Sequence, residues 1–140
     1  MSLLSDPCAV VEVHETKDIV LARRLARELA ATLGFGKADQ TRLATAVSEL
    51  TRNVIEYAGN GECQIFDTSD AVFNCVKVIV EDHGPGIADI DIAMQDGFST
   101  GGSLGAGLPG TRRLIDSFKI ESQPGMTRVT ITLSMRKVLR

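Results

Sequence analysis

Two polar residues, an acid and an amide, lie one helical turn apart near the middle of the chain. Glu49 and Asn53 are four residues apart, so they project from one face of a helix. They border an apolar stripe at helical spacing, formed by Leu43, Val47, Leu50 and Val54. An unpaired carboxylate is costly to remove from water. The pair offers a proton acceptor and an oxygen ligand for Mg²⁺; the alternative is a polar edge that faces water.

Length, charge and hydropathy limit the classes of protein to which the chain can belong. Its 140 residues are enough for one domain with one core, and we expect residues 1–7 to form a flexible tail. There is no apolar run near the ~20 residues that a membrane span needs, and no secretory signal pattern. A net charge of −3 argues against a nucleic-acid-binding surface. We therefore expect a cytoplasmic protein that binds neither membrane nor nucleic acid.

Alternating and helical apolar patterns divide the chain into strands and helices. Thr16 is expected to cap the first helix, with Asp18 in its first turn. The expected strands are 8–14, 62–68, 72–82, 118–123 and 127–135. The expected helices are 16–33, 39–57, 89–96 and 111–117.

Asp82 ends the third expected strand in phase with its apolar residues, so its carboxylate points inward. An acid at this position often caps the following turn, here the tight loop Gly84-Pro85-Gly86-Ile87. The glycine-rich segment 97–110 leads into a helix N-terminus near Gly107, an arrangement that can bind an anion. Three separate elements are thus suited to the base, the phosphates and the metal ion of one nucleotide.

Two familiar motifs in the glycine-rich segment lack the structural context that they require. Residues 105–110 fit G-x-G-x-x-G, but no buried parallel strand leads into them. Residues 101–105 fit the hydrolase pattern G-x-S-x-G, but both histidines precede the serine, whereas that fold places its histidine after it. The chain contains no G-x-x-x-x-G-K-[ST] motif. We therefore reject a dinucleotide fold, a hydrolase and a P-loop.

The order of three segments resembles the N-box and the two glycine boxes of the GHKL ATPases, which share the Bergerat fold. These segments are Glu49–Asn53, Asp82–Gly86 and Gly105–Gly107. Further matches, spread from about Val11 to Leu133, resemble the serine/threonine switch kinases of bacterial stressosome-type signalling. The resemblance implies an α/β two-layer sandwich with a mixed, mostly antiparallel sheet and helices on one face. Residues 1–140 would form one such ATP-binding domain.

The resemblance also implies roles for individual residues. Asp82 would accept a hydrogen bond from the adenine amino group, Asn53 would bind Mg²⁺, and Glu49 would orient or deprotonate the attacking hydroxyl. Residues 99–107 would form a lid over ATP. Arg128 stands where the family often has a threonine, so Thr127 is the substitute. The other expected nucleotide contacts are Gly84, Gly86, Ile87, Ser99, Thr100, Gly105, Ala106, Gly107 and Leu108.

The function that the resemblance implies is transfer of the ATP γ-phosphoryl group to a serine or threonine of a partner protein. The expected substrates are a STAS-domain antagonist and its co-antagonist scaffold, and the released kinase would activate a PP2C-type phosphatase. One alternative is an anti-sigma factor that sequesters a sigma factor, but segments 98–102 and 108–110 resemble the kinase branch more closely. Another is a nucleotide-gated binding module, against which Glu49 argues. The sequence leaves open whether the chain forms a homodimer.

Overall fold

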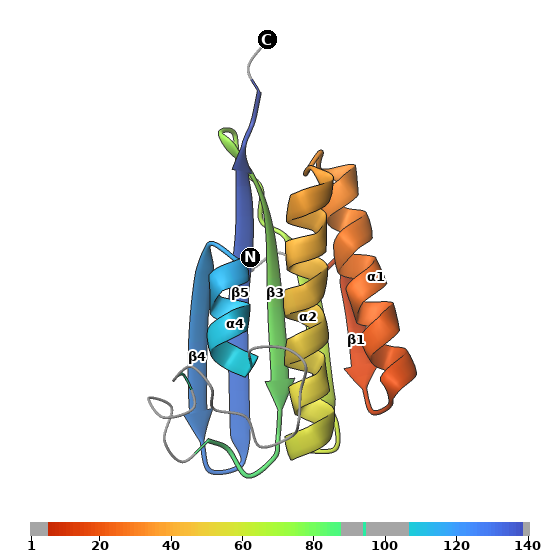
Figure 1. Ribbon diagram of the computed structural model, residues 1–140, viewed down its shortest axis with the longest axis vertical. Coiled ribbons are helices and arrows are strands. Elements are labelled where there is room, and N and C mark those ends of the chain that lie inside the picture. Colours follow the sequence, from red (N-terminus) through yellow and green to blue (C-terminus); the bar gives the residue numbers. More distant parts are fainter. Residues whose placement is uncertain (1–5, 88–93, 95–106, 139–140) are drawn as a thin grey trace.

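Five antiparallel strands form one sheet in the order β1-β2-β3-β5-β4 (Figure 1). The computed structural model describes residues 6–87, 94 and 107–138. Its strands are β1 (Ala9–Val13), β2 (Gly61–Asp67), β3 (Phe73–Asp82), β4 (Ser117–Gln123) and β5 (Met126–Arg136). Successive strand residues point to opposite faces of a sheet, which is why the alternating apolar residues of these segments form one buried face.

Three described helices cover that buried face (Figure 1). They are α1 (Thr16–Thr32), α2 (Lys37–Tyr57) and α4 (Gly107–Leu114). One continuous core joins the inner strand residues to the apolar faces of α1 and α2, and α4 packs against its margin. Each fully buried Leu or Val side chain in such a core contributes about 1.5–3 kcal/mol. The two-layer sandwich with helices on one face is thereby confirmed, and all four strand pairings are antiparallel.

The cap of α1 differs from the prediction. Thr16 is the first helical residue and Glu15 is the N-cap, with φ −135° and ψ 165°. The Asp18 carboxylate accepts hydrogen bonds from the backbone N–H groups of His14, at 2.9 Å, and Glu15, at 3.0 Å. These bonds lower the pKa of Asp18. The helix therefore begins where Asp18 can bond backward to the N-cap, as in a capping box, and the prediction for Thr16 is wrong by one residue.

Helix α4 begins four residues earlier than the expected range 111–117 and ends at Leu114. Glycine disfavours helix interiors, but Leu108 packs against the core and Pro109 is buried in the first turn, where proline is tolerated. Tertiary packing thus outweighs local propensity here. The helix expected at 89–96 lies outside the described residues, apart from Met94. None of the described helices has the length and hydropathy required to cross a membrane.

Candidate functional site

Glu49 lies against the core in the middle of α2, with only 6% of the residue exposed. Arg52, three residues later, donates a hydrogen bond from Nη1 to Glu49 Oε1 at 2.7 Å. This charged bond offsets part of the cost of burying the carboxylate. The alternative of a polar edge facing water is therefore wrong for Glu49. Its carboxylate is held in a defined position at the border of the core.

Asn53 follows one turn later on α2 and is half-buried. Its side-chain amide forms no hydrogen bond within the part of the chain that the structure describes. The neighbouring hydroxyls differ: Ser48 donates to Ala44 O at 2.8 Å and Thr51 donates to Val47 O at 2.7 Å. Those two side chains are satisfied by the helix backbone. Asn53 is also less buried than Ser48, Glu49 and Thr51, so it is the better placed of these residues to bind a ligand.

Asp82 ends β3 on the face that the helices cover, opposite Gly61 of β2 and Thr127 of β5. Its Oδ1 accepts a hydrogen bond from Gly84 N at 3.0 Å, so it caps the following turn. Partial burial raises the pKa of Asp82, and the bond from Gly84 opposes that shift. No residue in the described ranges donates to the second oxygen, Oδ2. One carboxylate oxygen thus fixes the loop, and the other remains an acceptor.

The glycines after Asp82 permit two close approaches of the loop to the rest of the protein. A Cβ on Gly84 would lie 2.6 Å from the Cβ of Ala58, which follows α2. Gly86 has φ +84°, and a Cβ there would lie 2.3 Å from the backbone oxygen of Gln123. Both positions therefore require glycine for packing within the protein. The expected contact of Gly86 with a base stays a prediction.

Three side-chain and backbone groups meet next to Asp82. Ile87 N donates to Ser122 Oγ at 2.7 Å, and the hydroxyls of Ser122 and Thr127 are 2.8 Å apart. Thr127 is only 9% exposed. The row Asp82, Thr127, Ser122 crosses three adjacent strands in register. Thr127 is therefore the register partner of Asp82 on β5, and its expected contact with the nucleotide stays a prediction.

Ser122 was not among the expected site residues. The short hairpin at Pro124-Gly125 is the signal that could have identified it, because a tight turn there places Ser122 opposite Thr127. Arg128, one residue further along, points to the opposite face of the sheet. It donates to Glu81 Oε1 from Nε at 3.1 Å and from Nη2 at 2.7 Å. Arg128 thus pairs with Glu81 on the face of the sheet that is opposite to Asp82.

The phosphate-binding part of the predicted site is described only in part. Gly107 begins α4 with φ +67°, so the predicted helix N-terminus is present at this residue. Leu108 packs against the core, and α4 packs against α2, the helix that carries Glu49 and Asn53. The other expected contacts of the lid lie outside the described residues: Ser99, Thr100, Gly105 and Ala106.

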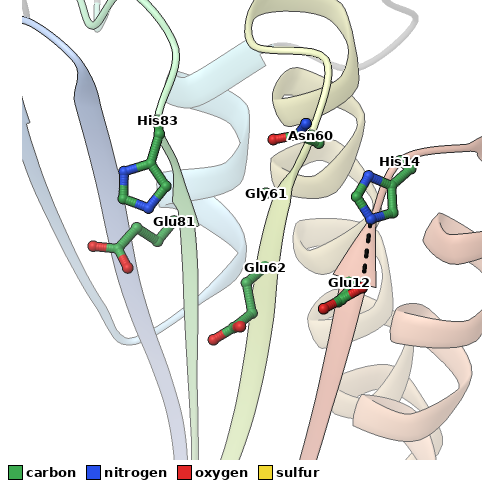
Figure 2. Close-up of a pocket in the computed structure, with 7 residues that line it drawn as sticks. All are labelled: Glu12, His14, Asn60, Gly61, Glu62, Glu81 and His83. Carbon is green, nitrogen blue, oxygen red and sulfur yellow. Dashed lines mark ion pairs between the residues drawn. The ribbon is translucent and has the colours of Figure 1, made fainter.

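A cavity of about 230 Å³ lies on the opposite face of the sheet (Figure 2). Glu12, Glu62 and Glu81 line it from three paired strands, and alternation places them on the face away from Asp82. Figure 2 shows the ion pair between His14 Nε2 and Glu12 Oε2, at 3.6 Å. The described residues contain no group of three or more acidic, histidine or cysteine side chains that could hold a metal ion. This cavity is separate from the predicted nucleotide site.

Comparison with known families agrees with this geometry. Residues 38–137 match the model of the "Histidine kinase-, DNA gyrase B-, and HSP90-like ATPase" family. The chain belongs to this family, whose members include the GHKL ATPases, and the family implies use of ATP. The resemblance found in the sequence is thereby confirmed.

A particular relative is the serine/threonine-protein kinase RsbT of Bacillus subtilis (strain 168). The two chains are 54% identical over 115 residues, which are 82% of this chain and 86% of RsbT. Residues 49–53 of α2, and residues 82–87 at the end of β3 and in the loop after it, lie within the family match. The similarity to this serine/threonine-protein kinase therefore extends over most of both chains.

Solved structures of more distant proteins share the fold. The RsbU and RsbW domains of a Mycobacterium tuberculosis protein give a TM-score of 0.63 at 18% identity, over 96% of this chain and 34% of that one. This chain thus spans about a third of that structure. The mycobacterial sensor histidine kinase MprB gives 0.54 at 16% identity, over 93% and 99% of the two chains. At these identities the matches show the fold alone.

Proposed function

We propose that the protein is a serine/threonine kinase that transfers the γ-phosphoryl group of ATP to a hydroxyl of a partner protein. The observation that carries this proposal is the 54% identity to RsbT across most of both chains. The arrangement of Glu49 and Asn53 on α2, beside a sheet that ends in Asp82, is consistent with it. The proposal places the kinase in the cytoplasm, where ATP is available.

Asp82 and Asn53 would bind the two ends of the nucleotide. The Asp82 oxygen that does not cap the turn accepts a hydrogen bond from the adenine amino group. The Asn53 amide oxygen suits Mg²⁺, which usually takes one or two protein oxygens and completes its shell with phosphate and water oxygens. When bound, this ion neutralises charge on the transferring group. Gly107 presents the backbone N–H groups of a helix N-terminus to the phosphates.

Glu49 is the group proposed to act on the nucleophile. Its carboxylate accepts the proton of the partner's serine or threonine hydroxyl as that oxygen forms a bond to phosphorus and the bond to the ADP oxygen breaks. Arg52, at 2.7 Å, stabilises the negative charge and fixes the position of the carboxylate. Phosphoryl transfer depends mostly on such positioning.

The partners are proposed from the resemblance to stressosome switch kinases. The substrates are a STAS-domain antagonist and its co-antagonist scaffold, and release from them frees the kinase to bind a PP2C-type phosphatase. The rival function is that of an anti-sigma factor, for which retention of a partner and not phosphorylation is the output. A homodimer is compatible with either function.

Capture of partners with and without hydrolysis tests the proposal. The purified protein is incubated with cell extract and Mg·ATP or a non-hydrolysable ATP analogue, and captured proteins are mapped for phosphorylated residues. We expect one partner to be retained with the analogue, and to be released and phosphorylated on serine or threonine with ATP. ATP-dependent capture of a partner that never becomes phosphorylated would contradict the kinase and support sequestration.

A further inference from the structure

We propose that the open face of the sheet is a docking surface for a partner protein, which places an arginine side chain between Glu12 of β1 and Glu62 of β2. These two residues are register partners, and both line the cavity of about 230 Å³ on this face. The described helices cover only the other face (Figure 1). Because Asp82 belongs to that other face, the docking surface is independent of the proposed kinase activity.

Glu12 and Glu62 place two negative charges directly opposite each other. Side chains at such positions have Cβ atoms about 4.5–5.5 Å apart, and like charges there destabilise a sheet. Glu62 accepts a neutral hydrogen bond from Gln64 Nε2 at 2.8 Å, and Glu12 Oε2 lies 3.6 Å from His14 Nε2. Among the described residues, neither carboxylate pairs with a lysine or an arginine. A cation bound between them would remove this repulsion.

The same row of the sheet shows which cation suits two neighbouring glutamates. Further along this row, Arg128 of β5 stands between Glu81 of β3 and Glu121 of β4. Its guanidinium group bonds Glu81 Oε1 at 2.7 and 3.1 Å and lies 3.8 Å from Glu121 Oε2. Arginine can bridge two carboxylates because its planar group has five N–H donors. A guanidinium group from a partner would give Glu12 and Glu62 the same arrangement.

The cavity beside these two glutamates has room for one side chain. Its volume is below the ~300–1,000 Å³ that is typical of small-molecule pockets. Figure 2 shows the carboxylates of Glu12 and Glu62 next to each other across β1 and β2, with His14 and His83 at one end of the strands. The described residues provide no set of three or more side chains placed to hold a metal ion. An organic cation therefore suits the cavity better than a metal ion.

An apolar margin next to the cavity favours a protein over a free amine. Val10 and Ile79 lie on the open face, two residues before Glu12 and Glu81 on their strands. Val10 is 50% exposed. Arginine is one of the residues that most often anchor protein interfaces, where apolar contacts surround the anchor and exclude water. We therefore expect the partner to carry an aliphatic residue beside its arginine.

Two short peptides test the surface: acetyl-Val-Arg-Val-amide and its citrulline analogue, which keeps the shape of arginine without the charge. NMR signals of the backbone amides of the full chain are followed while each peptide is added. We expect the arginine peptide to shift the signals of Val10, Glu12 and Glu62 until they saturate. The citrulline peptide should bind about tenfold more weakly, as expected for loss of a charged hydrogen bond.

Glu62→Gln removes one carboxylate and keeps the shape of the side chain. It should weaken binding of the arginine peptide by about two- to fivefold, as expected for a partly exposed pair. It should not lower thermal stability, because it removes a repulsion. Glu121→Gln is the matched control, since Glu121 lies in the same row but does not line the cavity. This control should bind the peptide like the wild type.

Three outcomes would overturn the proposal. The first is equal affinity for the arginine and citrulline peptides, or equal effects of Glu62→Gln and Glu121→Gln. The second is a set of shifts that extends to exposed acids on other elements, such as Glu28 of α1, since it would show general attraction to negative charge. The third is tighter saturation of the same signals by spermidine than by the arginine peptide, which would make a free polyamine the occupant.

Discussion

Two neighbouring rows of side chains cross the same three strands but have opposite properties. Glu81, Arg128 and Glu121 lie on the open face of the sheet. There Arg128 bonds Glu81 at 2.7 Å and lies 3.8 Å from Glu121. The other row, shifted by one residue along each strand, faces the helices and consists of Asp82, Thr127 and Ser122. In one row the charged side chains pair with one another, whereas in the other an acceptor oxygen of Asp82 is left for a ligand.

The difference shows that charge alone does not identify a site. The Glu81–Arg128 pair is partly exposed to water, so it contributes at most about 1 kcal/mol to stability. Asp82 loses solvation through burial and, among the described residues, gains one backbone hydrogen bond in return. A polar group that is held in place at such a cost is better explained by binding than by folding.

The largest expected effect is on the rate of phosphoryl transfer. It should distinguish two glutamates that each bond an arginine. Glu49 and Glu81 each bond an arginine at 2.7 Å. Glu49→Gln should lower the rate of phosphoryl transfer on the order of 10²–10⁴-fold, as loss of a catalytic base does, and leave Mg·ATP affinity near that of the wild type. Glu81→Gln should change neither. Transfer rates measured with radiolabelled ATP and the captured partner give the result, and equal rates for Glu49→Gln and the wild type would remove its catalytic role.

Much of this arrangement could be predicted from the sequence because it depends on local periodicity. Alternation identified the strands, and helical spacing placed Glu49 and Asn53 on one face of α2. Ser122 could not be predicted in the same way, because its bond to Ile87 joins residues 35 positions apart. The sequence predicted a helix N-terminus near Gly107, but the expected helical range 111–117 began too late, because burial of Pro109 outweighs the low helix propensity of glycine.

A pair of glycines tests how the loop after Asp82 is held. Gly86 and Gly125 both have positive φ, +84° and +89°. Of the two, only Gly86 lies so close to other backbone atoms, those of Gln123, that an added Cβ would clash with them. Gly125→Ala should lower the free energy of unfolding by about 1–2 kcal/mol through left-handed strain alone. Gly86→Ala should cost more and also weaken ATP binding. Chemical denaturation with calorimetry distinguishes them, and equal losses would mean that the close contact with Gln123 is unimportant.

The open-face row should contribute to stability and not to function. Arg128→Met keeps much of the side-chain length and removes the bonds to Glu81. We expect the free energy of unfolding to fall by about 1 kcal/mol or less, with ATP affinity unchanged. A loss of ATP affinity in this folded variant would show that the two rows are coupled.

The smallest expected effect is on the pH dependence of stability. Burial raises the pKa of Asp82 above its ordinary value of 3.8, so the folded protein binds this proton more strongly than the unfolded chain. Stability relative to Asp82→Asn should therefore rise as the pH falls through the folded pKa toward 3.8, and be lost as the pH increases. Denaturation of both proteins from neutral to acidic pH measures the difference, and a constant difference would contradict the burial effect.

ATP titration of Asp82→Asn, with Glu81→Gln as its neighbour on the opposite face, tests the central claim most directly. Asparagine can present a donor to the adenine amino group, and such a mismatch costs about 1–3 kcal/mol. We predict that ATP affinity falls at least about tenfold in folded Asp82→Asn, as that cost implies, and that Glu81→Gln binds like the wild type. Unchanged affinity in Asp82→Asn would contradict the assignment of adenine to this row.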